Sequence, residues 1–205
     1  MGKVRTGHST SLDGFIAGPN DGRDAPMGEG GERLLAWYSA GDTEYRLPAT
    51  EKVFKVSPQT AELLRQTRTT TGALVTGRRT FDFTNGWGGR HPLNVPVIVV
   101  SHTVPQEWVY ERSPFRFVTD GLESALEQAK AAAGNKNVAV MGGPDIGRQF
   151  IEAGLIDEIG VHLVPVLFGS GTRMFERLGG EHIQLETTGV IETPAAIHLG
   201  FRVIQ

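Results

Sequence analysis

The chain has two adjacent glycines, Gly142 and Gly143, directly after the apolar run 138–141 and directly before a predicted helix. Without a Cβ atom, the backbone at such a pair can approach a ligand closely. The helix that follows would direct unpaired N–H groups and the positive end of its dipole into the same gap. The pair therefore predicts a site for a phosphate or pyrophosphate, although glycine pairs also occur in ordinary turns.

Two more polar segments directly follow apolar runs: Gly77, Arg78, Arg79 and Thr80 come after residues 73–76, and Ser101 and His102 come after residues 96–100. Guanidinium groups bind a phosphate monoester through paired, charge-assisted hydrogen bonds, and hydroxyl groups complete such a shell. Taken singly, each segment could be a solvated turn. Together they lie after successive strands, where open α/β sheets bind their ligands, and they indicate a phosphorylated dinucleotide.

Other kinds of chemistry find less support. Pro144 breaks the G-x-G-x-x-G spacing, so a standard Rossmann dehydrogenase is disfavoured. Residues 169–171 do not complete the G-x-S-x-G elbow of acyl-transfer enzymes. The histidines show no metal-ligand spacing and the chain has no cysteine, so we expect no metal and no disulfide.

Composition is that of a small globular protein. The chain has 205 residues and a net charge of -3, which suits one domain spanning residues 1–205 and gives no broad attraction to nucleic acid. No apolar run approaches the ~18 residues of a membrane span, and the N-terminus lacks a signal-peptide pattern. We therefore expect a cytoplasmic protein that binds a small molecule, with no nucleic-acid or membrane partner.

The elements that would position these loops alternate between strands and helices. The runs 73–76, 96–100 and 138–141 are continuously apolar, a pattern typical of central parallel strands covered on both faces. Further strands are predicted at residues 4–9, 115–119, 158–163, 183–191 and 196–204, the last two forming an antiparallel hairpin. The prediction is an α/β fold with a mostly parallel sheet of about eight strands.

Three helices have recognisable ends. Ser57 precedes a proline and is a good N-cap for a helix through residue 64. Asp120 and Glu123 have the capping-box spacing before an apolar face over residues 122–133. A short helix of about ten residues is expected after the glycine pair. Residues 18–50 have weak periodicity and are interpreted as an excursion over one rim, with a possible helix at 32–39.

The order and spacing of these loops resemble the dihydrofolate-reductase-like superfamily, and more closely the branch related to the reductase domain of the bifunctional deaminase-reductase of riboflavin biosynthesis. The resemblance covers nearly the whole chain, through residues 11–17, 77–81, 101–102, 141–143, 154–158 and 165–169. It implies an eight-stranded sheet with helices on both faces, bound NADPH, and an often cis peptide bond between the two glycines.

The resemblance also assigns roles to individual residues. Gly142, Gly143 and the amides of Asp145 and Ile146 would hold the pyrophosphate; Gly77, Arg78, Arg79, Ser101 and His102 would form the 2′-phosphate site, with Thr80 on the neighbouring phosphate; and the backbone around Ala17 would face the nicotinamide. Asp13 would be either a turn residue or a carboxylate that orients substrate. Gly169 and Ser170 would lie near the substrate opening.

The segment 32–39 departs from dihydrofolate reductases, which carry a carboxylate on the first helix. Glu32 is the candidate for that group, but the sequence does not align the two, and Trp37 is assigned either to the core or to the pocket. The leading hypothesis is an NADPH-dependent reductase of a polar heterocycle, resembling 5-amino-6-(5-phosphoribosylamino)uracil reductase.

Three alternatives remain open. The first is a reductase of pterins or other small carbonyl compounds, the second an NADP-binding protein without turnover, and the third a purely structural or interaction domain. Because related reductases commonly pair, we also expect a homodimer, with the C-terminal hairpin and residues 164, 166 and 167 as a candidate interface.

Overall fold

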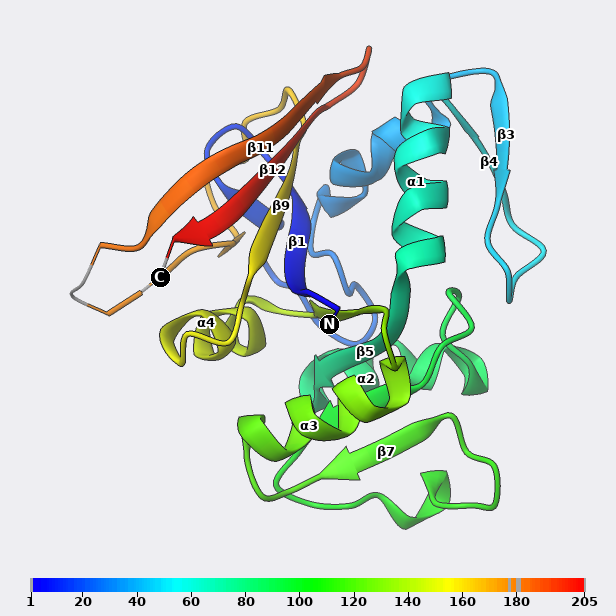
Figure 1. Ribbon diagram of the computed structural model, residues 1–205. Coiled ribbons are helices and arrows are strands. Elements are labelled where there is room, and N and C mark those ends of the chain that lie inside the picture. Colours follow the sequence, from blue (N-terminus) through cyan, green and yellow to red (C-terminus); the bar gives the residue numbers. More distant parts are fainter. Residues whose placement is uncertain (1, 177, 180–181, 205) are drawn as a thin grey trace.

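The computed structural model describes residues 2–176, 178–179 and 182–204, and its centre is an eight-stranded sheet. The sheet has the strand order β11-β12-β9-β1-β8-β5-β6-β7 (Figure 1). Its strands are β1 (Val4–Thr10), β5 (Thr71–Gly77), β6 (Val97–Val100), β7 (Phe115–Val118), β8 (Asn137–Met141), β9 (Glu158–Leu163), β11 (Gln184–Glu192) and β12 (Ile197–Ile204).

The six strands from β9 to β7 are parallel to one another, whereas β12 runs antiparallel to both β9 and β11. This arrangement confirms the predicted mostly parallel sheet with an antiparallel C-terminal hairpin. The helices are α1 (Pro58–Thr70), α2 (Arg78–Phe83), α3 (Leu122–Ala133) and α4 (Pro144–Glu152), with 3-10 turns η1 (Gly31–Ser39), η2 (Asn85–Gly89) and η3 (Gln106–Trp108).

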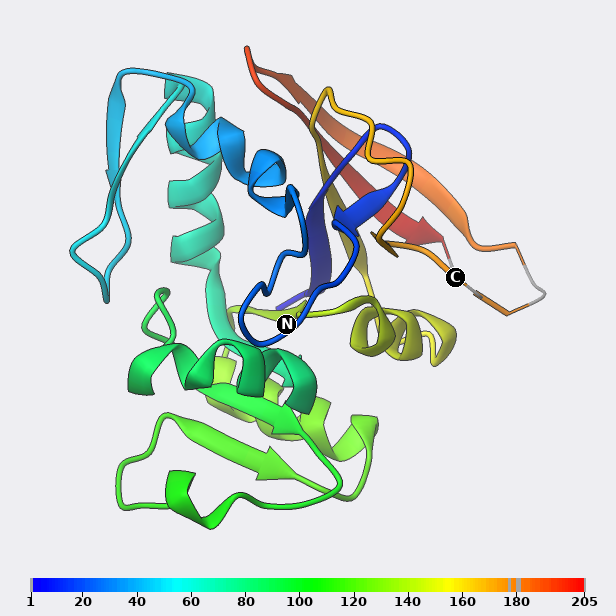
Figure 2. The ribbon, with the colours of Figure 1, turned by 180° about the vertical axis from the view of Figure 1, so that it is seen from behind.

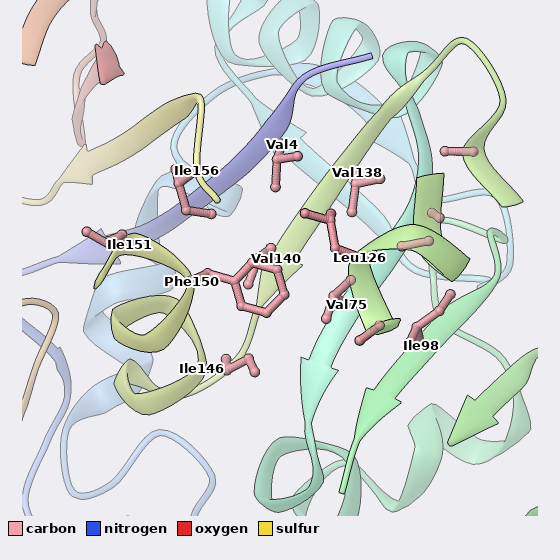
Figure 3. Packing of buried hydrophobic residues seen from close by; sticks show 14 of the residues in the cluster. Val4, Val75, Ile98, Leu126, Val138, Val140, Ile146, Phe150, Ile151 and Ile156 are labelled. Atoms are coloured by element: carbon pink, nitrogen blue, oxygen red, sulfur yellow. The ribbon is translucent and has the colours of Figure 1, made fainter. Parts of the chain in front are cut away.

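Helices cover both faces of the sheet, as the side chains of β5 show. Val75 packs in one cluster with Leu126 of α3 and Phe150 of α4, whereas its neighbour Leu74 packs with Phe81 of α2. Figure 3 shows the first cluster, with Phe150 directed at the central strands. The continuous apolar runs arise because alternate side chains enter two different cores.

Helix capping follows the sequence in one case and departs from it in another. The Ser57 hydroxyl accepts a hydrogen bond from the Thr60 amide at 3.1 Å, which confirms the predicted N-cap of α1. The capping box predicted for α3 is wrong, because Gly121, at φ 114°, is the N-cap and has no side-chain cap. Glycine accepts this conformation without strain, so the N-cap lies one residue after the predicted Asp120 and the helix begins at Leu122.

Four short strands lie outside the main sheet, and the sequence patterns did not predict them. β2 (Phe15–Ala17) pairs with β10 (Thr172–Arg173), and β3 (Thr43–Arg46) pairs with β4 (Val53–Val56). Charged side chains such as Glu44 and Lys55 hide the usual apolar alternation in the second pair. No helix within the described residues is both long and apolar enough to cross a membrane.

Candidate nucleotide-binding site

The three predicted loops meet at one edge of the sheet because three adjacent parallel strands end there. Gly77 at the end of β5 pairs with Val100 at the end of β6, and Thr76 pairs with Met141 at the end of β8. The loops that begin with Arg78, Ser101 and Gly142 therefore leave the sheet side by side. This edge is where open α/β sheets bind ligands.

The glycine turn is shaped by two threonines. Gly142 has φ 133°, and a Cβ atom there would lie 2.7 Å from the Thr80 hydroxyl oxygen and 3.1 Å from that of Thr76. The Gly143 amide donates to the Thr80 hydroxyl at 3.0 Å. Only glycine fits at position 142. The cis bond implied by the resemblance is not seen, since every described peptide bond is trans.

The N-terminus of α4 lies open beside this turn. Gly143 is its N-cap, with φ -64° and ψ 171°, and no side-chain cap is present. A Cβ atom built on Gly143 would meet nothing within 4 Å. The amides of Asp145 and Ile146 fall in the first turn, where N–H groups have no partner within a helix. Open space next to such donors fits an anionic group, as the pyrophosphate prediction requires.

Arg78 and Ser101 come together at the edge. Arg78 Nη1 lies 3.4 Å from the Ser101 hydroxyl and 3.4 Å from the Thr103 hydroxyl. Its Nε donates to Asp82 at 2.8 Å, one helical turn away, which orients the terminal N–H groups. The neighbouring His102 is exposed. We term Arg78, Ser101 and Thr103 the arginine seat.

Arg79 does not join the arginine seat. Its Nη2 donates to the Asp21 carboxylate at 2.9 Å, and its guanidinium lies 4.5 Å from the centroid of the Phe83 ring. Asp21 belongs to the segment that follows β2. Adjacent positions in the sequence have therefore separated, and only one of the two arginines lies against Ser101.

A cleft of about 420 Å³ adjoins the arginine seat at Arg78. It is lined by Arg23, Arg78, Phe81, Asp82, Asn85, Glu107, Trp108 and Tyr110. The lining combines aromatic rings with two guanidinium groups and two carboxylates, so it has no excess of positive charge for an anion.

Asp13 joins two loops at the far end of the same edge. Its carboxylate accepts hydrogen bonds from the Ser11 hydroxyl at 2.6 Å and from the amides of Phe168 and Gly169 at 3.1 and 2.7 Å. The Ser11 hydroxyl foremost, and then the two amides, lower the pKa of Asp13 to about 2. These contacts favour the interpretation of Asp13 as a turn residue, because its oxygens already have partners within the protein.

The other residues predicted to lie near the substrate do not gather at one place. Ala17 lies in β2 and pairs with Thr172, and both Gly169 and Ser170 are exposed. Glu32 is exposed at the start of η1, and among the described residues it has no hydrogen bond to another predicted site residue.

Trp37 is packed in the core. It is 2% exposed, packs with Leu34 and Val164, and donates its indole N–H to the Ser9 hydroxyl at 2.9 Å. These contacts favour the core alternative for Trp37.

A histidine pair lies beside Trp37. Nδ1 of His162 and Nδ1 of His198 are 2.9 Å apart, and Nε2 of His198 is 3.3 Å from the Thr60 hydroxyl. Burial is the largest cause that lowers the pKa of His162, to about 4, and burial lowers the pKa of His198 as well, so both rings favour the neutral form at pH 7. Across residues 2–176, 178–179 and 182–204, no three His, Asp or Glu side chains gather as metal ligands.

Sequence reasoning missed Thr76, Asp21 and Thr172 as parts of this edge. Thr76 ends the predicted strand 73–76, and its hydroxyl oxygen is buried beneath Gly142 without a hydrogen-bond partner among the described residues. Asp21 and Thr172 lie 58 residues or more from the groups they contact. No local pattern reports such distant pairs.

Comparison with known families finds one that matches this chain. The model of the RibD C-terminal domain matches residues 3–199. Among curated protein sequences, no match to this chain was found.

Solved structures share the fold at low sequence identity. A protein from Shewanella sp. PV-4 provisionally assigned to riboflavin biosynthesis has a TM-score of 0.68 at 21% identity, with 99% of each chain covered. The diaminohydroxyphosphoribosylaminopyrimidine deaminase/5-amino-6-(5-phosphoribosylamino)uracil reductase of Thermotoga maritima gives 0.63 at 14% identity, covering 99% of this chain but 57% of that one. A pyrimidine reductase-like protein from Corynebacterium diphtheriae gives 0.58 at 15% identity, covering 100% and 92%.

The family match spans nearly the whole chain, and solved structures of similar fold cover 99–100% of it. The chain belongs to the RibD C-terminal domain family.

Proposed function

We propose that this protein is an NADPH-dependent reductase that transfers hydride to a polar heterocycle similar to 5-amino-6-(5-phosphoribosylamino)uracil. The observation that carries the proposal is the pairing of two phosphate-binding features on one sheet edge. The open turn at Gly143 suits a pyrophosphate, and the arginine seat beside it suits a phosphate monoester. Among nicotinamide nucleotides, only the 2′-phosphorylated forms carry both groups.

When bound, the cofactor would supply the hydride, and the chain would supply orientation and exclusion of water. Gly142, Gly143 and the first-turn amides of α4 would hold its pyrophosphate, with Thr80 supporting the turn from below. Arg78 and Ser101 would hold its 2′-phosphate. The loop pair joined by Asp13 would border the substrate.

The test measures the oxidation of NADPH in the presence of each compound of a substrate panel, through the decrease in NADPH absorbance. The panel contains a ribosylaminopyrimidine, dihydrofolate, a quinone and a simple carbonyl compound. Oxidation of NADPH with the ribosylaminopyrimidine supports the proposal. Binding of NADPH without oxidation by any compound supports instead the alternative of a nucleotide-binding protein without turnover.

We further propose a homodimer that uses the C-terminal hairpin, where Leu185, Val190 and Ile197 are exposed. Of the residues suggested for this interface from the sequence, Leu167 is exposed, whereas Val164 is buried within the subunit. Light scattering with size-exclusion chromatography tests the state, and a Val190→Glu variant should shift it to the monomer.

A further inference from the structure

We infer that the two adjacent arginines have different tasks: Arg78 recognises the 2′-phosphate, and Arg79 is a positioning residue that fastens the segment 18–30 to α2 through Asp21. The inference rests on the proposed function for the identity of the nucleotide. It changes the expectation that both guanidinium groups hold the same phosphate.

Arg79 contacts the segment 18–30 through Asp21. Its Nη2 lies 2.9 Å from a carboxylate oxygen of Asp21 and 3.3 Å from the Asp21 carbonyl oxygen. The other carboxylate oxygen of Asp21 accepts from the Thr172 hydroxyl at 3.2 Å. The Asp21 side chain is 25% exposed and that of Arg79 is 63% exposed, so only the carboxylate end of the pair is shielded from water. Asp21 therefore joins α2, β10 and its own segment at one point.

The segment 18–30 is held together as a unit, so one contact can fix all of it. The Gly18 amide donates to the Met27 carbonyl at 2.8 Å, and the Glu29 amide donates to the Pro19 carbonyl at 2.9 Å. Gly28 approaches the backbone of Gly18 so closely that a Cβ atom there would lie 2.2 Å from the Gly18 carbonyl oxygen. These contacts fold the segment back on itself.

The segment 18–30 runs between two parts of the proposed site, so the contact between Arg79 and Asp21 affects both. It leaves β2, whose Ala17 pairs with Thr172, and Figure 2 shows it in blue, descending to the green helices around α2. It thus links the loops proposed to border the substrate with the helix that carries the arginine seat. Fastened by Arg79, the segment would hinder release of a nucleotide that lies along this edge.

Arg78 differs from Arg79 in where its terminal nitrogens point. Asp82, on the same helix, engages its Nε, while Nη1 faces the hydroxyl groups of Ser101 and Thr103. These distances of 3.4 Å are long for hydrogen bonds, so the nitrogen is loosely held by the protein. A phosphate oxygen can replace such contacts more readily than the shorter pair of Arg79 and Asp21.

The positioning role of Arg79 is tested with the variant Asp21→Asn, which removes the charge that holds Arg79. The matched control is Asp24→Asn, which removes an equal charge from the same segment. Dissociation rates of NADPH and NADH are measured by stopped flow. Since a partly exposed ion pair is worth little, we expect Asp21→Asn to speed release of both nucleotides by about two- to five-fold. The ratio of their affinities should stay unchanged, and the control should match wild type.

A second measurement needs no nucleotide. Trypsin cleaves after Arg23, which is exposed within the segment. We expect faster cleavage there in Asp21→Asn and Arg79→Gln, and no further increase when the two are combined, because both remove the same contact. Unchanged cleavage in either variant would overturn the inference.

The outcomes also distinguish the inference from the function on which it rests. Tighter binding of NADPH alone in Asp21→Asn would contradict the inference, because it would mean that Asp21 competes with a phosphate for Arg79. Wild-type protein that binds neither nucleotide would refute the proposed function, and the trypsin result would then decide the Arg79 contact by itself.

Discussion

The substitution Gly143→Ala separates binding from folding more cleanly than any other change at this edge. The backbone of Gly143, at φ -64° and ψ 171°, is allowed for alanine, and the new methyl group would meet no protein atom within 4 Å. Restricting the unfolded chain stabilises by roughly 0.4–1 kcal/mol, while alanine is a poorer N-cap than glycine by a similar amount. We therefore expect stability within about 1 kcal/mol of wild type, or about 4 °C in Tm.

Nucleotide binding should respond differently. The methyl group would project into the space assigned to the pyrophosphate, next to the amides of Asp145 and Ile146. Loss of one hydrogen bond to a charged group costs about 1.5–3 kcal/mol, which corresponds to roughly 10- to 150-fold in Kd. Isothermal titration with NADPH measures the affinity, and thermal unfolding measures the stability.

Gly142→Ala is the matched comparison. Its methyl group would lie 2.7 Å from the Thr80 hydroxyl oxygen at a φ of 133°, so this variant should lose about 1–3 kcal/mol of stability as well as binding. An unchanged Kd in Gly143→Ala would refute the assignment of the open space to phosphate. A large fall in its Tm would refute the claim that the space is open.

Three further predictions concern the surroundings of the site. Thr80→Val leaves the Gly143 amide without its acceptor and should lower the unfolding free energy by about 1–3 kcal/mol, measured by urea denaturation. Asp13→Asn should lower Tm at pH 7; because the folded pKa of Asp13 is about 2 against 3.8, the difference from wild type should shrink as pH falls from 4 to 2. The pKa of His162 is lowered from 6.5 to about 4 in the folded protein. As the pH falls from 6.5 to 4, the unfolded chain therefore takes up a proton before the folded protein does, and the free energy of unfolding should decrease. His162→Phe should remove up to about 3 kcal/mol of that fall, and an unaltered pH profile would contradict it.

Local rules predicted the parts of the fold that local forces determine. The apolar run at 73–76 is continuous because its alternate side chains enter two cores, and Ser57 caps α1 because its hydroxyl reaches an amide three residues ahead. The glycine pair was recognisable because position 142 requires a residue without a Cβ atom. These features can be read from a few neighbouring residues.

Features that depend on distant partners were not predictable in this way. Arg78 and Arg79 are chemically alike, and only the placement of Asp21, 58 residues before Arg79, separates them. Likewise, the oxygens of Asp13 are engaged by amides more than 150 residues away, which no spacing within the first loop reveals. Tertiary contacts therefore separate the surroundings of Arg78 from those of Arg79, while the sequence predicted the sheet edge at which both lie.

The most direct test of the account is equilibrium titration of wild type and Arg78→Ala with NADPH and NADH. Wild type should bind NADPH more tightly. Arg78→Ala should lose about 1.5–3 kcal/mol of NADPH binding, roughly 10- to 150-fold, with NADH binding little changed. Equal affinity of the wild-type protein for the two nucleotides, or an equal loss of both in the variant, would contradict the claim that this edge recognises a 2′-phosphate.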